Sequence, residues 1–177
     1  MAKTGDDAKL IKFQDQFINE WARMSSSWGI NRTMAQIHAL LFITGRAQSM
    51  DEIIDRLHIS RGNASMNLRD LMDWGIVERS REPGERKDLY ASDSDPVRMF
   101  ARVVRERKRR ELDPTHQAIS EILHQTTADA DNEDVAILRE RLQGLREVFD
   151  IVNSLYDQIL RTDEAFEQTL MLFGRRD

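Results

Sequence analysis

The 177-residue chain contains no cysteine and only three prolines. Without cysteine it has no disulfide bond, no thiolate metal ligand and no thiol nucleophile. The N-terminal stretch MAKTGDDAKL lacks the apolar core of a secretory signal, and the longest apolar run, HALLFITG, is far shorter than the ~20 residues that span a bilayer. We therefore expect a cytoplasmic protein. Few prolines, with 32% charged residues, favour a helical fold over a β-sandwich or barrel.

Charge is unevenly distributed along the chain, whose overall net charge is −5. Residues 1–59 are neutral, residues 60–110 hold 13 basic and 9 acidic side chains, and residues 111–177 hold 6 basic and 15 acidic ones. A basic centre beside an acidic segment predicts one face for a polyanion and another kept away from it. Charge alone does not separate this interpretation from a basic stretch that is simply solvated.

Apolar residues recur at helical spacing in the first third of the chain. A first helix is predicted over residues 7–28, and a second begins near Thr33 and weakens at Gly45. Ser49 and Glu52 have the spacing of a capping box in front of a short third helix, MDEIIDRL.

The next segment, ISRGNASMNLRDL, combines small, polar and basic residues with a thin apolar stripe. Ser60 is a favourable N-cap, because its hydroxyl can accept a hydrogen bond from the first turn. Ala64, Leu68 and Leu71 recur at intervals of four and three, which predicts the buried side of a helix that ends at Gly75. The remaining side chains of this helix are free to meet a partner.

Two short strands, IVERSRE and KDLYAS, are predicted after this helix, around a hairpin loop that contains Pro and Gly. Three helices, a tight turn into the last of them and then a hairpin make a winged helix-turn-helix. In such a domain the last helix lies in the major groove of DNA and its N-terminal residues reach base edges. The fold class predicted is mainly α, with a three-helix core, a two-stranded β-wing, and long N- and C-terminal helices that form a dimerisation region.

The predicted recognition helix and wing carry side chains suited to DNA. Arg61 and Arg69 can bond bidentately to guanine or pair with phosphate, and Asn63 can read adenine. Basic side chains on the wing would enter a minor groove or grip the backbone. The predicted DNA-binding residues are Ser60, Arg61, Gly62, Asn63, Ser65, Met66, Arg69, Arg81, Arg86 and Lys87.

A second basic run, RVVRERKRR at residues 102–110, is less specific. It could add phosphate contacts, each of which would steepen the salt dependence of binding. It could equally pair with the acidic final segment of the same subunit or of a partner, and we slightly favour that alternative because the run lies beyond the wing.

The last long helix carries a heptad seam, with apolar residues spaced alternately by three and four. This pattern favours packing between helices, plausibly of two subunits. The predicted dimerisation residues are Leu138, Leu142, Leu145, Phe149, Val152 and Tyr156. The expected organisation is an N-terminal dimerisation helix at residues 1–30, a DNA-binding domain at 31–93 and a helical dimerisation region at 94–177.

The segments GINRTMAQIHALLFI, MDEIIDRLHISRGNASMNLRDLMDWGIVERSREPGERKDLY and FARVVRERKRRELDP resemble the MarR-type winged-helix regulators, most closely the GbsR branch. The resemblance covers roughly residues 10–115. It implies a homodimeric bacterial transcription factor, usually a repressor, that binds a pseudo-palindromic operator and responds to a small molecule. One departure is TMAQI, where many relatives have a glycine and an arginine, so Ala35 and Gln36 leave the role of that position open.

Some relatives respond to choline or glycine betaine, which an aromatic cage can hold by cation–π contact. The aromatic side chains available for such a cage are Trp21, Trp28, Trp74, Phe149 and Tyr156. These residues are equally suited to the core and to the heptad seam, so the sequence does not identify the effector. The sequence implies no bound cofactor or metal.

Two other functions, enzymatic activity and protein docking, fit the sequence less well. An enzyme lacks support, because Glu121 and His124 form an isolated Glu-x-x-His pair, and no phosphate-binding loop with its lysine is present. A winged helix that only docks other proteins is the second alternative. A docking wing has no need for basic residues on both the helix and the hairpin, so Arg69 and the Arg86–Lys87 tip favour DNA.

Overall fold

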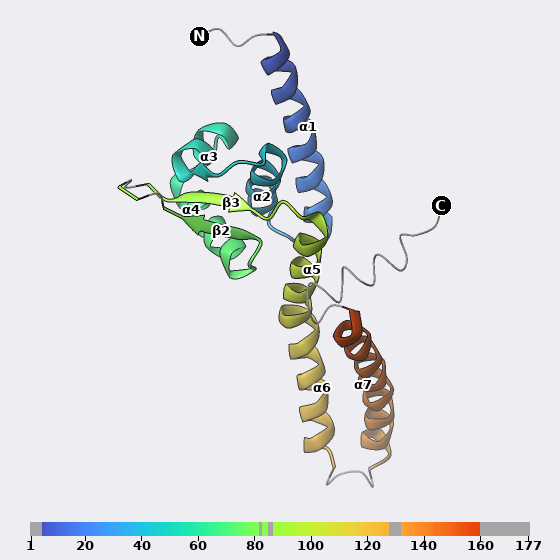
Figure 1. The fold of residues 1–177 in the computed structure, drawn as a ribbon. Helices are drawn as coiled ribbons and strands as arrows, with labels where there is room; N and C mark the ends of the chain where they lie inside the picture. Colours follow the sequence, from blue (N-terminus) through green and yellow to red (C-terminus); the bar gives the residue numbers. More distant parts are fainter. Residues whose placement is uncertain (1–4, 82, 85–86, 128–131, 160–177) are drawn as a thin grey trace. The chain divides into compact units, whose positions relative to one another are not determined.

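The computed structural model describes residues 5–81, 83–84, 87–127 and 132–159 (Figure 1). The chain divides into two compact units, Met1–Met99 and Phe100–Asp177. Within the described residues, every helix is too short or too polar to cross a bilayer.

The first unit is a helical domain with a small antiparallel sheet. In chain order its elements are α1 (Gly5–Ser27), α2 (Arg32–Thr44), β1 (Gln48–Ser49), α3 (Met50–Leu57), α4 (Arg61–Asp73), β2 (Val77–Ser80) and β3 (Leu89–Ser92). Figure 1 shows the strands β2 and β3 side by side next to α4, as the wing of a helix-turn-helix. The predicted fold class, mainly α with a winged helix, is confirmed.

Side-chain caps set the ends of these helices. Asn31 begins α2, because its Oδ1 accepts hydrogen bonds from the backbone N–H groups of Thr33 and Met34 at 2.9 and 3.2 Å. The predicted capping box at α3 is confirmed: the Ser49 hydroxyl accepts from the Glu52 N–H, and the Glu52 carboxylate accepts from the Ser49 N–H at 2.8 Å. The two caps fix where α2 and α3 begin.

The core of the first unit lies between α2, α3 and α4. The largest side chains that are less than 2% exposed are Ile37, Leu40, Leu41, Gln48, Ile53, Leu68 and Leu71. Helix α1 adds an aromatic layer on α2, in which the ring of Trp21 lies 5.9 Å from that of His38 and the ring of Phe17 lies 6.4 Å from that of Phe42. The predicted buried stripe of α4 is confirmed, and it holds this helix against α2.

The sheet has one strand more than the sequence predicted. Its order is β1–β3–β2, with Gln48 opposite Tyr90 and Val77 opposite Ser92. Strand β1 has only two residues, too few to show the alternation that marks a strand. Its pairing fastens the base of the wing to the segment that leads into α3.

Helix α5 (Pro96–Arg107) begins at the end of the first unit, and the sequence Asp95–Pro96 predicts this start: Asp95 Oδ1 accepts from the Val97 N–H at 2.8 Å. A π-helical turn, η1 (Lys108–Leu112), follows and leads directly into α6 (Asp113–Gln125), which has Pro114 in its first turn.

The basic run at residues 102–110 forms ion pairs with near neighbours. The Glu106 carboxylate accepts hydrogen bonds from Arg109 at 2.6 Å and from Arg110, which lowers the pKa of Glu106. Lys108 Nζ lies 2.6 Å from Asp113 Oδ1. These described pairs lie within one helical stretch, and a pairing of the run with the acidic final segment stays a prediction.

In the second unit, α6 packs against α7 (Glu133–Ile159). Ile119 and Leu123 of α6 are buried, and His116 of α6 stacks on Phe149 of α7 with ring centres 6.1 Å apart. Four of the predicted seam residues are half-buried, whereas Leu138 and Leu145 are each 44% exposed. A second apolar row on α7 is more exposed still; it consists of Ile137, Val148, Ile151 and Leu155.

Candidate nucleic-acid interface

One side of α4 is exposed and carries most of the predicted DNA-binding side chains. Arg61, Met66 and Arg69 are exposed, with Met66 at 63%. Ser60 caps the helix, because its hydroxyl accepts from the Asn63 N–H at 3.2 Å. The space around Gly62 is open and would admit a Cβ, so any need for glycine comes from a partner that approaches closely.

The Asn63 side chain is already oriented within the protein. Its Nδ2 donates to Thr33 Oγ1 of α2 at 3.3 Å, and its Oδ1 accepts from Asn67 Nδ2 at 2.6 Å. Asn67 is 3% exposed and also donates to the Asn63 carbonyl at 2.8 Å. This pair ties the start of α4 to α2, and a duplex would meet Asn63 in a fixed position.

The wing presents basic side chains that are paired with one aspartate. Arg79 and Arg81 are 57% and 58% exposed, and both lie against Asp88, with Arg81 Nη2 at 2.6 Å and Arg79 Nη1 at 3.6 Å. Lys87, at the beginning of the returning arm, is 67% exposed. Arg86 lies outside the described residues, so its predicted role stays a prediction.

A carboxylate of α3 connects the helix to the wing. Asp51, in the first turn of α3, forms an ion pair with Arg61 at the start of α4, and its other oxygen lies 3.5 Å from Lys87 Nζ. The hydrogen bond and charge of Arg61, with a smaller contribution from Lys87, lower the pKa of Asp51. The carboxylate is therefore ionised at neutral pH, and it brings cations of two separate elements to one place.

The structure thus places Arg61 and Lys87 on a common carboxylate, and it leaves Met66 and Arg69 exposed on the next turns of α4. Ser65 is half-buried. Two residues of the site were missed by sequence reasoning. Asn67 could have been found from its spacing of four to Asn63, which places both on one helix face. Asp51 had no such signal, because it reaches Arg61 across a turn between helices.

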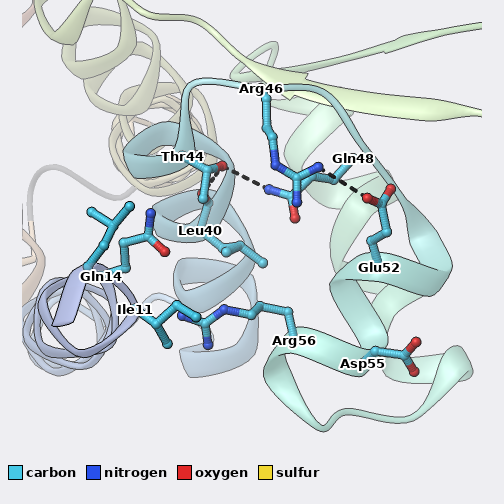
Figure 2. Close-up of a pocket in the computed structure, with 10 residues that line it drawn as sticks. Ile11, Gln14, Leu40, Thr44, Arg46, Gln48, Glu52, Asp55 and Arg56 are labelled. Carbon is cyan, nitrogen blue, oxygen red and sulfur yellow. Dashed lines mark hydrogen bonds and ion pairs between the residues drawn. The ribbon is translucent and has the colours of Figure 1, made fainter. Parts of the chain in front are cut away.

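A groove lies on another side of the first unit, between α1, α2 and α3. It has a volume of about 600 Å³. Figure 2 shows Ile11 and Gln14 reaching it from α1, Leu40 and Thr44 from α2, and charged side chains from the following segment and α3. These charged side chains are Arg46, Glu52, Asp55 and Arg56.

Two ion pairs involve charged side chains that line this groove. Arg46 Nη1 lies 3.1 Å from Glu52 Oε1, and Arg56 Nη2 lies 2.6 Å from Asp15 Oδ1 of α1. Gln48 is 1% exposed and donates to Thr44 Oγ1 at 2.8 Å. The groove therefore has an apolar floor and a polar rim of balanced charge.

The described residues contain no cluster of three or more metal-ligating His, Asp or Glu side chains. Glu121 and His124, the isolated pair noted in the sequence, are both exposed on α6. Glu121 accepts a hydrogen bond from Gln117 Nε2 at 2.8 Å.

Comparison with known proteins points to transcription factors. Residues 28–88, which hold α2, α3, α4 and most of the wing, match the MarR family. YvaV of Bacillus subtilis (strain 168), named as an HTH-type transcriptional regulator, is 24% identical over 87% of this chain and 87% of its own length. The HTH-type transcriptional repressor GbsR of the same organism is 21% identical over 94% of this chain and 96% of its own.

One solved structure, the crystal structure of a transcriptional regulator, covers 82% of this chain and 98% of that protein with a TM-score of 0.55. The two sequences are 22% identical, so this likeness concerns the fold. It extends well past the winged helix and includes much of the helical remainder.

Proposed function

We propose that this chain, whose residues 28–88 match the MarR family, is a sequence-specific double-stranded DNA-binding regulator of transcription. We further propose that it acts as a repressor, in the cytoplasm, within the GbsR branch. The repressor role is suggested by the names of the relatives GbsR and OpcR, the latter 23% identical over about half of this chain.

The observation that carries the proposal is the exposed side of α4. A polar helix with arginines is often only a solvated surface, but here Arg69 and Met66 are exposed while Leu68, between them in sequence, is buried. The helix thus separates a packed side from a side with hydrogen-bonding and apolar groups suited to base edges. A protein-docking module, the alternative, would not need Arg61 and Lys87 brought together beside that side.

Arg69→Ala is expected to reduce discrimination between operator and unrelated DNA by about 1–3 kcal/mol, because a bidentate contact to a base edge is lost. Lys87→Ala is expected to weaken binding to all sequences alike and to lower the slope of affinity against salt by about 1. The operator is first found by sequencing DNA that the purified protein selects from a random pool. Titrations of both variants on operator and scrambled duplexes then follow.

The pair of variants separates the two functions. Direct readout is contradicted if both bind operator like the wild type, and a protein-docking role gains support if no duplex is selected at all. Each variant serves as the other's control, since both remove one exposed cation.

We propose that the protein is a homodimer. A single chain leaves six large apolar side chains of α7 exposed, among them Ile151 at 62% and Val148 at 55%. An extended apolar row of this kind is typical of an interface, and a second copy would cover it together with the predicted seam. Two recognition helices related by a two-fold axis would then read half-sites ~34–36 Å apart.

Ile151→Glu is expected to shift the protein from dimer to monomer at micromolar concentration, because it buries an unpaired charge in the interface. Light scattering measures the change. Glu147→Gln, on the same helix and exposed, is the matched control and should leave the dimer intact. A wild-type protein that is monomeric under these conditions would refute the proposal.

We propose that a small-molecule effector changes the affinity for DNA, with the groove between α1, α2 and α3 as its site. Residues 46–52 connect the groove to the candidate DNA-binding surface. Arg46 and Glu52 line the groove, and Asp51 contacts Arg61 and Lys87. A ligand that fits only one position of this segment would shift DNA affinity by its differential affinity for the two positions.

The groove's chemistry bears on choline and glycine betaine, the effectors implied by resemblance. The described lining contains no aromatic side chain, so a quaternary ammonium there would be held by Glu52 and Asp55 rather than by cation–π contact. Trp21, an alternative cage residue, is packed against Phe17 and His38. A candidate effector counts as such only if it moves the midpoint of a DNA titration; compounds that bind without doing so are excluded.

A further inference from the structure

Asp51 lies between one cation of the predicted recognition helix and one cation of the wing. Its carboxylate holds Arg61 of the predicted recognition helix and Lys87 of the wing, and both cations are largely exposed, at 71% and 67%. A hollow of about 170 Å³ lies at this point, with Asp51, Arg61 and Lys87 in its lining. In the free protein one carboxylate thus already holds both side chains that would attract a phosphate, and it cancels one of their two positive charges.

The position of Asp51 is fixed by the backbone around it. It lies inside the Ser49–Glu52 capping box, and Ser49 pairs with Leu89 of the wing in the sheet. The backbone of Asp51 therefore cannot move away from the wing without breaking the first turn of α3 or the β1–β3 pairing.

We propose that Asp51 restrains sequence-independent binding to DNA, by competing with backbone phosphate for Arg61 and Lys87. When both cations bind phosphate, Asp51 is left without a partner, and a solvent cation must then take their place. One fewer counterion is therefore released on binding than the number of basic side chains would give. This inference rests on the proposed DNA-binding function.

The test is Asp51→Asn, measured on operator and scrambled duplexes over a series of salt concentrations. One further released ion steepens the slope of log K against log salt by about 1 and tightens binding to scrambled DNA about fivefold at 0.15 M salt. Arg69 is untouched, so the ratio of operator to scrambled affinity is not expected to rise.

Asp55→Asn is the matched control, titrated without any effector so that its place in the groove between α1, α2 and α3 has no bearing. It removes the same charge from the same helix, but Asp55 lies on the groove side of α3 (Figure 2) and not in the hollow by the wing. Asp51→Glu keeps the carboxylate and should bind like the wild type, which also checks that the first turn of α3 still folds. Thermal melting of each variant records any change in stability.

A double-mutant cycle identifies the partners. In a protein that already carries Arg61→Gln and Lys87→Gln, Asp51→Asn should do no more than Asp55→Asn. The proposal is overturned if Asp51→Asn matches Asp55→Asn in the otherwise native protein, or if it weakens binding, which would mean that the carboxylate organises the DNA-binding surface. Failure of the wild type to bind any duplex refutes the proposed function itself, whereas normal operator binding with an inert Asp51→Asn refutes only this inference.

Discussion

Leu68→Ala is expected to lower the free energy of unfolding by about 2–5 kcal/mol, one of the two largest effects that we predict. Leu68 is 1% exposed and lies in the middle of α4, on the side that packs against α2. Truncation removes apolar contacts and leaves a cavity that neighbouring helices fill only in part. For a domain whose total stability is of the order of 5–15 kcal/mol, this is a large fraction.

The matched control is Met66→Ala on the same helix. Met66 is 63% exposed, so its truncation should change stability by no more than about 0.5 kcal/mol. Both substitutions introduce alanine, which keeps helix propensity favourable. Urea denaturation followed by circular dichroism, at one fixed protein concentration because a dimer contributes by mass action, measures both. Equal effects of the two variants would contradict the packing of α4 described above.

The two variants also separate fold from function. If Met66 faces DNA, Met66→Ala should alter operator affinity while the protein stays as stable as the wild type. Leu68→Ala should instead lower the fraction of folded protein and reduce binding to all DNA together. A loss of operator binding in a destabilised variant therefore says nothing about base contacts until stability has been measured.

Features that depend on neighbours in sequence were predictable. The caps at Ser49, Ser60 and Asp95 each involve a side chain and a backbone N–H two or three residues away. The buried stripe of α4 follows from the helical period alone. For this reason the helix-turn-helix and the exposed side of its last helix could be derived before any coordinates.

Features that depend on distant contacts were not predictable. Asp51 meets Lys87 across 36 positions only because β1 pairs with β3 and closes the base of the wing. The hydrogen bond from Asn63 to Thr33 likewise spans 30 positions. Sequence reasoning found the cations and Asn63 of the candidate site, but it missed Asp51, which holds two of the cations, and Asn67, which holds Asn63.

The second large effect is a loss of folding stability at acidic pH. His38 is buried, with 3% exposure, between the rings of Trp21 and Phe42, and burial lowers its pKa from 6.5 to about 4. Below pH 6.5 the unfolded chain therefore binds a proton that the folded protein does not, so stability falls as the pH falls from 6.5 toward 4. The loss from this residue reaches about 3 kcal/mol at pH 4, where the folded protein also begins to protonate.

His38→Phe keeps a ring in the aromatic layer and removes the titration, so its unfolding free energy should fall less steeply between pH 6.5 and 4.5. This window isolates the histidine, because the carboxylates with lowered pKa values, Asp51, Glu52 and Glu106, lose their stabilising charge only at lower pH. His124→Gln, at an exposed position of α6, is the control and should keep the wild-type slope. Urea denaturation at a series of pH values measures the slopes, and an unchanged slope in His38→Phe would show that His38 is protonated without leaving the core.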